Sequence, residues 1–320
     1  MPFTFNQRQL PADGKTRLCG IVNVTPDSFS DGGQWYGIDA AYDHAMQLIE
    51  QGAEMIDIGG ESTRPGSAYV PVEEEIERVI PVIERLKQAT DTPLSIDTWK
   101  APVAKAAIES RVDIINDITG FLGDEAMADV VAHSNAGAIL MFNPIIARPT
   151  HPGSQIFPSF GTGWAFTQQE LEMLATAPIE MVLTTYLHKA IDRALEAGIE
   201  PERLMLDPGI GFGLTKRENL LLIQRIHLLH DLGYPAFVGV SRKRFIVNLL
   251  ASDNLPSDPD TEEGFLTRDL GSASLTAIVA LQGAEVLRVH TIPPHRIARD
   301  MAVAVRNADQ QSDQNFDAYH

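Results

Sequence analysis

Short apolar runs recur along this chain and alternate with segments of helical periodicity, a pattern typical of strand–helix–strand units in a parallel sheet. No Gly-x-Gly-x-x-Gly turn follows the first run, and a lone Gly-x-Gly at 211–213 is weak evidence for a nucleotide site. Eight repeats therefore favour a (β/α)8 TIM barrel over an open doubly wound sheet. The eight runs lie at residues 18–24, 54–60, 93–98, 113–118, 137–143, 203–209, 236–243 and 285–291.

Two stretches interrupt the repeat without dividing the chain. Residues 143–164 are rich in Pro, Gly and Ser, and residues 251–269 are acidic and rich in turn formers, so we expect both to be long loops. We therefore predict a single domain, the barrel at 18–306. An N-terminal extension at 1–17 precedes it, and a polar, disordered tail at 307–320 follows.

Charge and cysteine content exclude several classes of partner. The 320 residues carry a net charge of −18, which repels nucleic acid and anionic membranes, although a local basic cluster can still bind a small anion. Cys19 is the single cysteine, so there is no disulfide framework. The chain shows no signal-peptide pattern and no apolar stretch of membrane-spanning length, and we expect it in the cytoplasm.

Polar side chains stand near the carboxyl ends of nearly all the apolar runs, which is the end of a barrel that carries active sites. Taken singly, each has a structural interpretation, such as capping a turn or forming an ion pair. Together they predict a polar ring at one barrel mouth. In chain order they are Asn23, Asp57 with the segment 61–64, Asp97, Asn116 with Asp117, Asn143, Asp207, Ser241 with Lys243, and Arg288 with His290.

The residue types in this ring indicate a ligand with a donor-rich edge. A buried aspartate accepts paired hydrogen bonds from an N–C–N edge, and asparagine offers one donor and one acceptor. Asp97, Asn116 and Asp207 therefore suit a pterin or a guanine-like heterocycle, and Lys243 supplies a donor to a ring carbonyl or nitrogen.

The same ring indicates an anionic end of the ligand. Arg288 and His290 lie two residues apart on one strand and face the same side, where both suit a phosphate or pyrophosphate. The spacing of histidines and carboxylates predicts no transition-metal site. We expect His188, His227 and His230 to lie on helix surfaces.

At these motifs the chain resembles the dihydropteroate synthases, over about residues 18–305. The first two motifs below and the DPGIGFG motif are highly specific in combination. The resembling segments, in the family's order, are NVTPDSFSDGG (23–33), DIGGESTRPG (57–66), SIDT (95–98), INDI (115–118), LDPGIGFG (206–213), VSRK (240–243) and RVH (288–290).

The resemblance implies a transferase of folate biosynthesis and a sulfonamide target. Such an enzyme joins 6-hydroxymethyl-7,8-dihydropterin diphosphate to 4-aminobenzoate and releases pyrophosphate, with Mg²⁺ as cofactor. The resemblance also implies a homodimer formed through helices away from the barrel mouth.

The resemblance further implies roles for individual residues. The pterin pocket would contain Asp97, Asn116, Met141, Asp207, Lys243 and Arg288. The diphosphate would be bound by Asn23, Arg64, Arg288 and His290, and Asn23 would also meet the metal. The aminobenzoate side would be shaped by Phe29, Thr63, Pro65, Phe212 and Ser241.

Some of these roles have alternatives that the sequence leaves open. Arg64 either touches the diphosphate or pairs with an acidic residue when the loops close, and Met141 either contacts the ligand or fills the core. Loss of diphosphate leaves positive charge on the pterin methylene, so we expect anion stabilisation, with Asp97, Lys243 and Arg288 catalytic, and no covalent intermediate. We expect the segment 25–33 to be a mobile loop over the substrates.

Three departures from the family pattern keep other functions open. MFNPII and an insertion follow the fifth run where Met-His-Met and a glycine are usual, Thr291 replaces an aspartate, and the 251–269 segment is long. The alternatives are a corrinoid-dependent methyltetrahydrofolate methyltransferase, which has no need for the first two motifs or RVH, and a non-catalytic pterin-binding paralogue.

Overall fold

The computed structural model of the chain describes residues 2–25, 34–258, 260–310 and 312–313. Within them, eight parallel strands form one sheet in the order β8-β7-β6-β5-β4-β3-β10-β9. A parallel bridge joins Leu206 to Ala236, and the Leu206 amide donates to the Pro235 carbonyl at 3.0 Å, so β8 meets β9. The predicted (β/α)8 barrel is confirmed.

Each predicted apolar run coincides with one strand of the barrel, and β3 begins one residue before its run, at Arg17. Because these runs are apolar and rich in β-branched residues, they pack well when buried on both faces of a parallel sheet. The strands are β3 (Arg17–Asn23), β4 (Met55–Gly59), β5 (Leu94–Asp97), β6 (Ile114–Asp117), β7 (Gly137–Met141), β8 (Leu204–Asp207), β9 (Phe237–Val238) and β10 (Val286–Val289).

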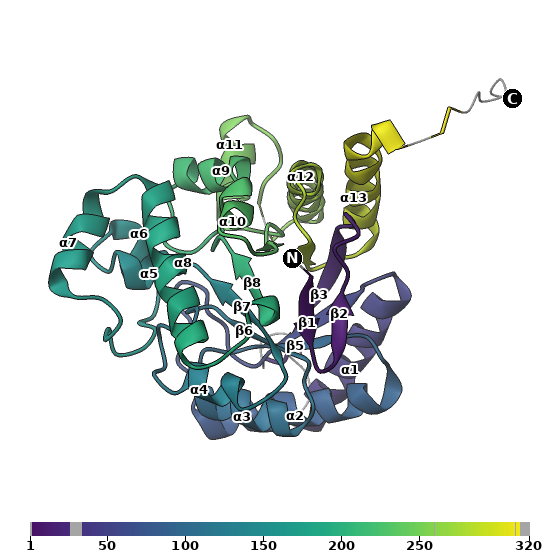
Figure 1. Cartoon of the computed structure of the whole chain (residues 1–320). Coiled ribbons are helices and arrows are strands. Elements are labelled where there is room, and N and C mark those ends of the chain that lie inside the picture. Colours follow the sequence, from purple (N-terminus) through teal and green to yellow (C-terminus); the bar gives the residue numbers. More distant parts are fainter. Residues whose placement is uncertain (1, 26–33, 259, 311, 314–320) are drawn as a thin grey trace, which may run out of the picture.

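Helices follow the strands and surround the sheet (Figure 1). The helices that follow single strands are α1 (Gln34–Glu50), α2 (Val72–Ala89), α3 (Ala101–Glu109), α4 (Met127–Ala132) and α13 (Pro293–Arg306). After β7 come α5 (Pro144–Ala147), α6 (Pro152–Gln155), α7 (Gln168–Thr176) and α8 (Ile179–Glu196). After β8 come α9 (Lys216–Gln224) and α10 (His227–Asp231), and after β9 come α11 (Arg244–Ser252) and α12 (Glu262–Leu281). Short 3-10 turns lie at Pro201–Arg203 and Ala308–Gln310.

The prediction of an acidic loop at 251–269 is wrong over the second half of that segment. Residues 262–269 begin the long helix α12 instead of continuing the loop. Thr261 caps this helix by accepting a hydrogen bond from the Gly264 amide, and Glu262 and Glu263 occupy its first turn. Carboxylates are favoured there by the helix dipole, so the acidic composition marked a helix start.

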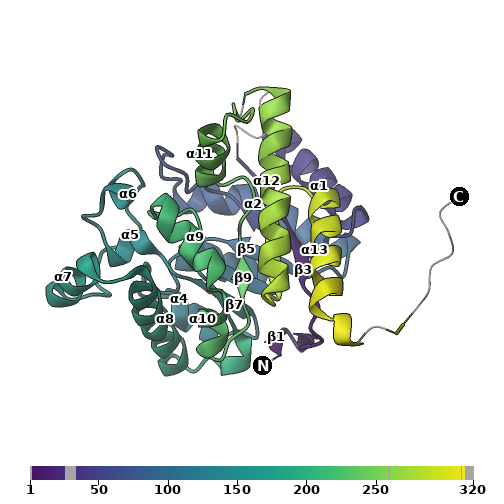
Figure 2. The same ribbon diagram turned by 90° about the horizontal axis from the view of Figure 1, so that it is seen from above.

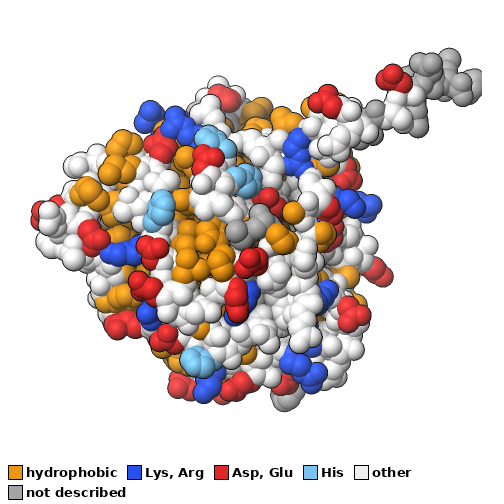
Figure 3. Space-filling model, viewed as in Figure 1, with side chains coloured by type: hydrophobic (Ala, Val, Ile, Leu, Met, Phe, Trp, Pro, Cys, Tyr) orange, Lys and Arg blue, Asp and Glu red, His pale blue; other side chains and the backbone are white. Residues whose placement is uncertain are grey.

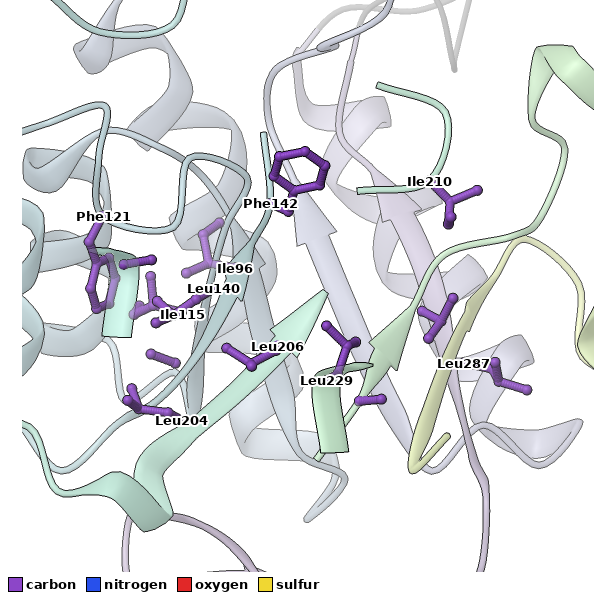
Figure 4. Packing of buried hydrophobic residues seen from close by; sticks show 14 of the residues in the cluster. Ile96, Ile115, Phe121, Leu140, Phe142, Leu204, Leu206, Ile210, Leu229 and Leu287 are labelled. Carbon is purple, nitrogen blue, oxygen red and sulfur yellow. The ribbon is translucent and has the colours of Figure 1, made fainter. Parts of the chain in front are cut away.

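The main hydrophobic core lies between the outer face of the sheet and the helices. Residues such as Ile96, Ile115 and Leu140 project from the strands into this layer, where Phe121 and Phe142 also pack (Figure 4). All five side chains are fully buried. This layer holds the strands in place from outside and leaves their inward-facing side chains free to form the barrel interior.

The N-terminal extension forms a hairpin that closes the floor of the barrel. Strands β1 (Phe3–Phe5) and β2 (Arg8–Leu10) pair antiparallel, and Phe3 and Phe5 are 1% and 2% exposed. Both rings pack against a second apolar cluster formed by inward-facing strand residues. The strand residues of this floor cluster are Cys19, Met55, Ile114, Ile139, Met205, Phe237 and Val286.

The surface carries mixed charge on the face seen in Figure 3, where acidic and basic side chains are interspersed with small hydrophobic areas. No helix in the described part of the chain is long and apolar enough to cross a membrane. The predicted tail at 307–320 lies mostly outside the described residues.

The hairpin's contribution to stability can be tested with Phe3→Ala. Removing a buried phenyl ring leaves a cavity in the floor, so we expect the free energy of unfolding to fall by about 3–5 kcal/mol. Denaturant unfolding measures this change. Gln9→Ala, on the exposed edge of the same hairpin, is the matched control. Equal effects of the two substitutions would contradict a structural role for the hairpin.

Candidate active site

The barrel interior changes from apolar to polar between the floor and the carboxyl ends of the strands. Side chains on a strand alternate between its two faces, so residues two apart both point inward. On four strands the first of these residues belongs to the apolar floor cluster and the second is polar. The pairs are Met55 and Asp57 on β4, Ile114 and Asn116 on β6, Met205 and Asp207 on β8, and Val286 and Arg288 on β10.

Asp57 lies at the centre of the polar layer and is fully buried. Its carboxylate accepts hydrogen bonds from Arg288 Nε at 2.5 Å and Asn116 Nδ2 at 3.1 Å through one oxygen. The other oxygen accepts from Ser95 Oγ at 2.6 Å. A buried carboxylate is stable only with such partners, so Asp57 fixes three neighbouring side chains in the barrel.

Arg288 joins Asp57 to a second carboxylate. Its Nη2 donates to Asp97 Oδ2 at 2.7 Å, so the planar guanidinium lies between two strands other than its own. Burial opposes the charge of Arg288, but the carboxylates of Asp57 and Asp97 raise its pKa above the ordinary value. Burial raises the pKa of Asp97 to about 7, although the nearby charge of Arg288 acts in the opposite direction.

Asp207 and Lys243 face the same interior from β8 and from the segment after β9. Burial raises the pKa of Asp207 to about 6, while a hydrogen bond from the Gly209 amide at 2.7 Å acts against this rise. Burial lowers the pKa of Lys243 to about 8, and the charge of Asp207 acts against that shift. Both groups are charged at neutral pH, yet a bound ligand can change their protonation at small cost.

The Gly-Phe-Gly turn after β8 leaves room for the lysine. Gly211 has a φ of +91°, and a Cβ at this position would lie 2.7 Å from Lys243 Cδ, so only glycine fits. The next residue, Phe212, places its ring centroid 5.1 Å from Lys243 Nζ. The ammonium therefore has an aromatic neighbour and carboxylates around it.

A group of cations surrounds His290 at the mouth. His290 Nδ1 lies 3.0 Å from Ser241 Oγ. Burial lowers the pKa of His290, and the positive charges of Arg242, Arg288, Arg64 and Lys243 lower it further, so the imidazole is neutral at physiological pH. Of these cations, Arg242 is already bound by both carboxylate oxygens of Asp269, and Arg288 is bound by Asp57 and Asp97, which leaves Arg64 and Lys243. The remaining positive charge makes this part of the mouth a suitable site for an anion.

An apolar wall completes one side of the mouth. Met141 is 3% exposed and packs with Ile118, Ile145 and Phe160. Phe212 packs against the same cluster and stacks on Phe157, with ring centroids 5.9 Å apart and an interplanar angle of 24°. Met141 therefore packs within an apolar cluster that extends to Phe212 beside Lys243.

Two residues of the predicted ring are used by their own loops, so their assignment to the ring is wrong. Asn143 is fully buried, donates to the Ile118 carbonyl at 2.9 Å and caps α5 by accepting from the Ile145 amide at 3.0 Å. Asp117 is also fully buried and accepts from the amides of Thr119 and Phe121 at 2.7 and 2.9 Å. Both side chains satisfy turns behind the mouth.

The loop residues of the predicted site are divided between described and undescribed segments. Asn23 is the last residue of β3. A Cβ added to Gly59 would lie 3.9 Å from Asn23 Oδ1 and would also contact the Asp97 side chain, so Asn23 and Asp97 are close to one another across Gly59. Thr63 is half-buried, and Arg64 and Pro65 are exposed on the loop after β4. Phe29 lies outside the described residues.

The structure gives a central position to Asp57, predicted only as one member of the polar ring, and to Ser95 and Trp99, which have no predicted role. Asp57 and Ser95 bind one another beneath the mouth, and their inward alternation with Met55 and Asp97 is the sequence signal for this placement. Trp99 packs edge-on against Phe160, which no periodicity predicts. Among the described residues, no group of three or more His, Cys, Asp or Glu side chains is arranged to hold a metal ion.

Comparisons with known proteins identify the family of this chain. The family described as "Pterin binding enzyme" matches residues 19–290. The dihydropteroate synthase of Bacillus subtilis is 38% identical over 87% of this chain and 84% of its own length, and that of Clostridium beijerinckii is 39% identical over 87% and 90%.

The chain belongs to the dihydropteroate synthase family. It is therefore an enzyme of the transferase class in folate biosynthesis, as predicted. Solved dihydropteroate synthases have the same fold. The Xanthomonas albilineans enzyme with 4-aminobenzoic acid has a TM-score of 0.77 and 36% identity, covering 98% of this chain and 100% of that one. The Yersinia pestis enzyme in a sulfonamide drug complex has a TM-score of 0.76 and 32% identity, covering 96% and 100%.

The central role of Asp57 can be tested with Asp57→Asn. The variant leaves Arg288 with one carboxylate, so we expect the free energy of unfolding to fall by about 3–5 kcal/mol and the affinity for a free pterin to fall as well. Denaturant unfolding and titration calorimetry measure the two effects. Asp113→Asn is the control, because Asp113 is an equally buried carboxylate paired with Lys87 before β6. Unchanged pterin affinity in Asp57→Asn would contradict its role in the site.

Proposed function

We propose that this barrel joins 6-hydroxymethyl-7,8-dihydropterin diphosphate to 4-aminobenzoate, giving 7,8-dihydropteroate and pyrophosphate. The observation that carries the proposal is the fixed position of Arg288 between Asp57 and Asp97, beside the cations around His290. This arrangement places a carboxylate-lined pocket next to an anion site, which matches a heterocycle that bears a diphosphate.

The pterin end of the substrate would occupy the interior below the mouth. Asp97 and Asp207 would accept hydrogen bonds from ring nitrogens, Asn116 would offer a donor and an acceptor, and Lys243 would donate to the ring. The wall formed by Met141 and Phe212 supplies an apolar side for a flat heterocycle. The raised pKa values of Asp97 and Asp207 allow each carboxyl group to match the protonation state of the bound ring.

The diphosphate would lie among the cations at the mouth. Lys243 and the N–H groups of Arg288 that Asp57 and Asp97 leave free would approach it from the interior. Arg64 would reach the same region from the loop after β4, since its charge acts on both His290 and Lys243. A neutral His290 adds a hydrogen bond without adding charge. For Arg64, this proximity to the cations favours a contact with diphosphate.

Mg²⁺ is the proposed cofactor, and the donor set fits a metal that the substrate brings with it. Mg²⁺ in phosphate sites usually keeps several waters and takes few protein ligands, so the single amide oxygen of Asn23 at the mouth is a sufficient protein contact. When bound, the ion would neutralise charge on the departing pyrophosphate.

Catalysis in this site would depend on charge stabilisation and positioning. As the C–O bond to the diphosphate breaks, its electron pair leaves with pyrophosphate, and Arg288 and Lys243 stabilise the leaving anion. Positive charge develops on the pterin methylene, where the Asp97 carboxylate is a suitable stabilising group. The aminobenzoate nitrogen donates its lone pair to this carbon, and the ammonium product loses a proton to solvent. No side chain needs to form a covalent bond.

The aminobenzoate side would be formed by the exposed rim of the mouth. Thr63 and Pro65 lie on the loop after β4. Ser241, which is buried, lies beside His290, and Phe212 lies beside Lys243. Phe29 remains a predicted contact. The cytoplasm remains the predicted location.

The reaction can be tested directly with the purified chain. We expect pyrophosphate and dihydropteroate in equal amounts when Mg²⁺, the pterin diphosphate and 4-aminobenzoate are present, and loss of turnover on chelation of the metal. Asp97→Asn should lower kcat by a factor of about 100 or more. Pterin binding without any product would contradict the synthase proposal and would indicate a non-catalytic pterin-binding protein. Methyl transfer from methyltetrahydrofolate to a corrinoid protein would support the methyltransferase instead.

We also propose that the chain forms a homodimer through α12 and α13, which lie side by side away from the mouth (Figure 2). Both helices expose apolar side chains at helical spacing, a feature typical of protein interfaces. On α12 these include Leu266 and Leu270, which are 59% and 56% exposed. On α13 they are Ile297, Met301 and Val305, which are 62–69% exposed.

Sedimentation of a charged variant tests the dimer. Leu270→Lys would place an ammonium in the interface, so we expect a dimeric wild type and a monomeric variant. Met173→Lys is the control, since Met173 is 43% exposed on α7. A wild type that sediments as a monomer at micromolar concentration would exclude this assembly.

A further inference from the structure

The side chain of Glu61 closes the base of the loop from Glu61 to Val70. Glu61 Oε1 accepts a hydrogen bond from the Val70 amide at 2.8 Å, which joins the two ends of the loop. Between them lie Thr63 and Pro65, the residues proposed to meet aminobenzoate. The tip is exposed at Arg64, Pro65 and Gly66, and its turn is closed by two bonds from Ser67 to the Arg64 carbonyl. The base is where the loop is attached to the rest of the barrel.

Two residues directly after β5 bind the other oxygen of Glu61. Trp99 Nε1 donates to Glu61 Oε2 at 2.9 Å, and Lys100 Nζ lies 3.1 Å from the same oxygen. Both side chains begin two and three residues after Asp97, which is part of the site. The base of the loop is thus bound to the segment that carries a residue of the pterin pocket.

The ammonium of Lys100 holds both ends of the loop at once. It donates to the Val70 carbonyl at 2.5 Å and to Glu75 Oε2 at 2.6 Å, in addition to its contact with Glu61. The side chain of Lys100 is 3% exposed, and its Nζ lies 4.4 Å from the ring centroid of Tyr69. An ammonium this deeply buried persists only with close anionic partners, which makes the arrangement rigid.

The inserted segment after β7 supports this base from the opposite side. Phe160 packs edge-on against Trp99, with centroids 5.9 Å apart and an interplanar angle of 85°. The crevice between the loop and Pro158–Phe160 has a volume of about 30 Å³, roughly the space of one water molecule. Trp99 is therefore held between Glu61 and Phe160 and has little freedom to turn.

We propose that Trp99 and Lys100 are positioning residues that set the loop from Glu61 to Val70 over the mouth and thereby determine the capture of 4-aminobenzoate. The proposal rests on the function proposed above. The four residues Glu61, Val70, Trp99 and Lys100 form one unit, called here the Glu61 clamp. It acts mainly on the second substrate, because the loop contributes Thr63 and Pro65 to that side. Of the residues proposed to bind the pterin diphosphate, only Arg64 lies on the loop, while Asp97, Asn116 and Asp207 lie outside the clamp.

The decisive variant is Trp99→Phe, which removes the indole N–H and keeps an aromatic ring against Phe160. Loss of one hydrogen bond to a charged acceptor should raise KM for aminobenzoate about tenfold. KM for the pterin diphosphate should rise less, by no more than about threefold, because Arg64 is its one proposed contact on this loop. Lys100→Met removes contacts to both loop ends and should raise KM for aminobenzoate further. If this second variant does not fold, Trp99→Phe alone decides.

Lys87→Met is the matched control for Lys100→Met. Lys87 pairs with the buried Asp113 before β6 and has no contact with the loop after β4 among the bonds and ion pairs of the described residues. The variant Lys87→Met should lower the unfolding temperature and leave both KM values unchanged. A purely structural role for the clamp predicts the same behaviour for Trp99→Phe.

A double-mutant cycle gives an independent check. Glu61→Ala and Trp99→Phe both remove the contact between these two side chains, so their combined effect on KM for aminobenzoate should be smaller than the product of the single effects. Independent effects, or equal rises in both KM values, would overturn the proposal. A wild type that makes no dihydropteroate would instead count against the proposed function.

Discussion

The polar interior of this barrel depends on the contact of Arg288 with Asp57 and Asp97. Moving a guanidinium or a carboxylate out of water costs several kcal/mol, and removal of one partner leaves that cost uncompensated. Here one cation serves two anions from different strands, at 2.5 and 2.7 Å. The mouth can therefore hold charged groups within a parallel sheet whose strands are otherwise apolar, and the position of Arg288 is fixed before any ligand arrives.

Along the barrel axis, the residues of the floor contribute mainly to stability, and the residues of the mouth also contribute to ligand binding. Phe3 and Phe5 of the hairpin fill the floor with apolar contacts, and the charged groups begin one inward position higher. Substitutions at the floor should act on the folded state as a whole. Those at the mouth act on the ligand as well, since the side chains there face solvent or substrate on one side.

Much of the fold and part of the site could be predicted from the sequence. Local periodicity located all eight strands, and strand ends located Asp97, Asn116, Asp207 and Arg288, because inward direction follows from alternation. Alternation does not show where a side chain turns after the strand ends. Asn143 was therefore assigned to the mouth, although it caps α5. The aromatic contacts of Phe157 and Phe160 join segments distant in sequence, and no local pattern encodes them.

Because the shortest strand of the sheet pairs weakly with its neighbour, a bound ligand can help to hold the two strands together. β9 has two residues, and β8 joins its neighbour through the bridge at Leu206 and Ala236. Asp207 stands at the end of β8 and Lys243 follows β9, so these two groups lie on opposite sides of the seam that the isolated bridge joins. A heterocycle bound to both would tie the two strands together through side chains. The bound substrate would then close the barrel between β8 and β9, and the barrel would be most resistant to unfolding when the substrate is bound.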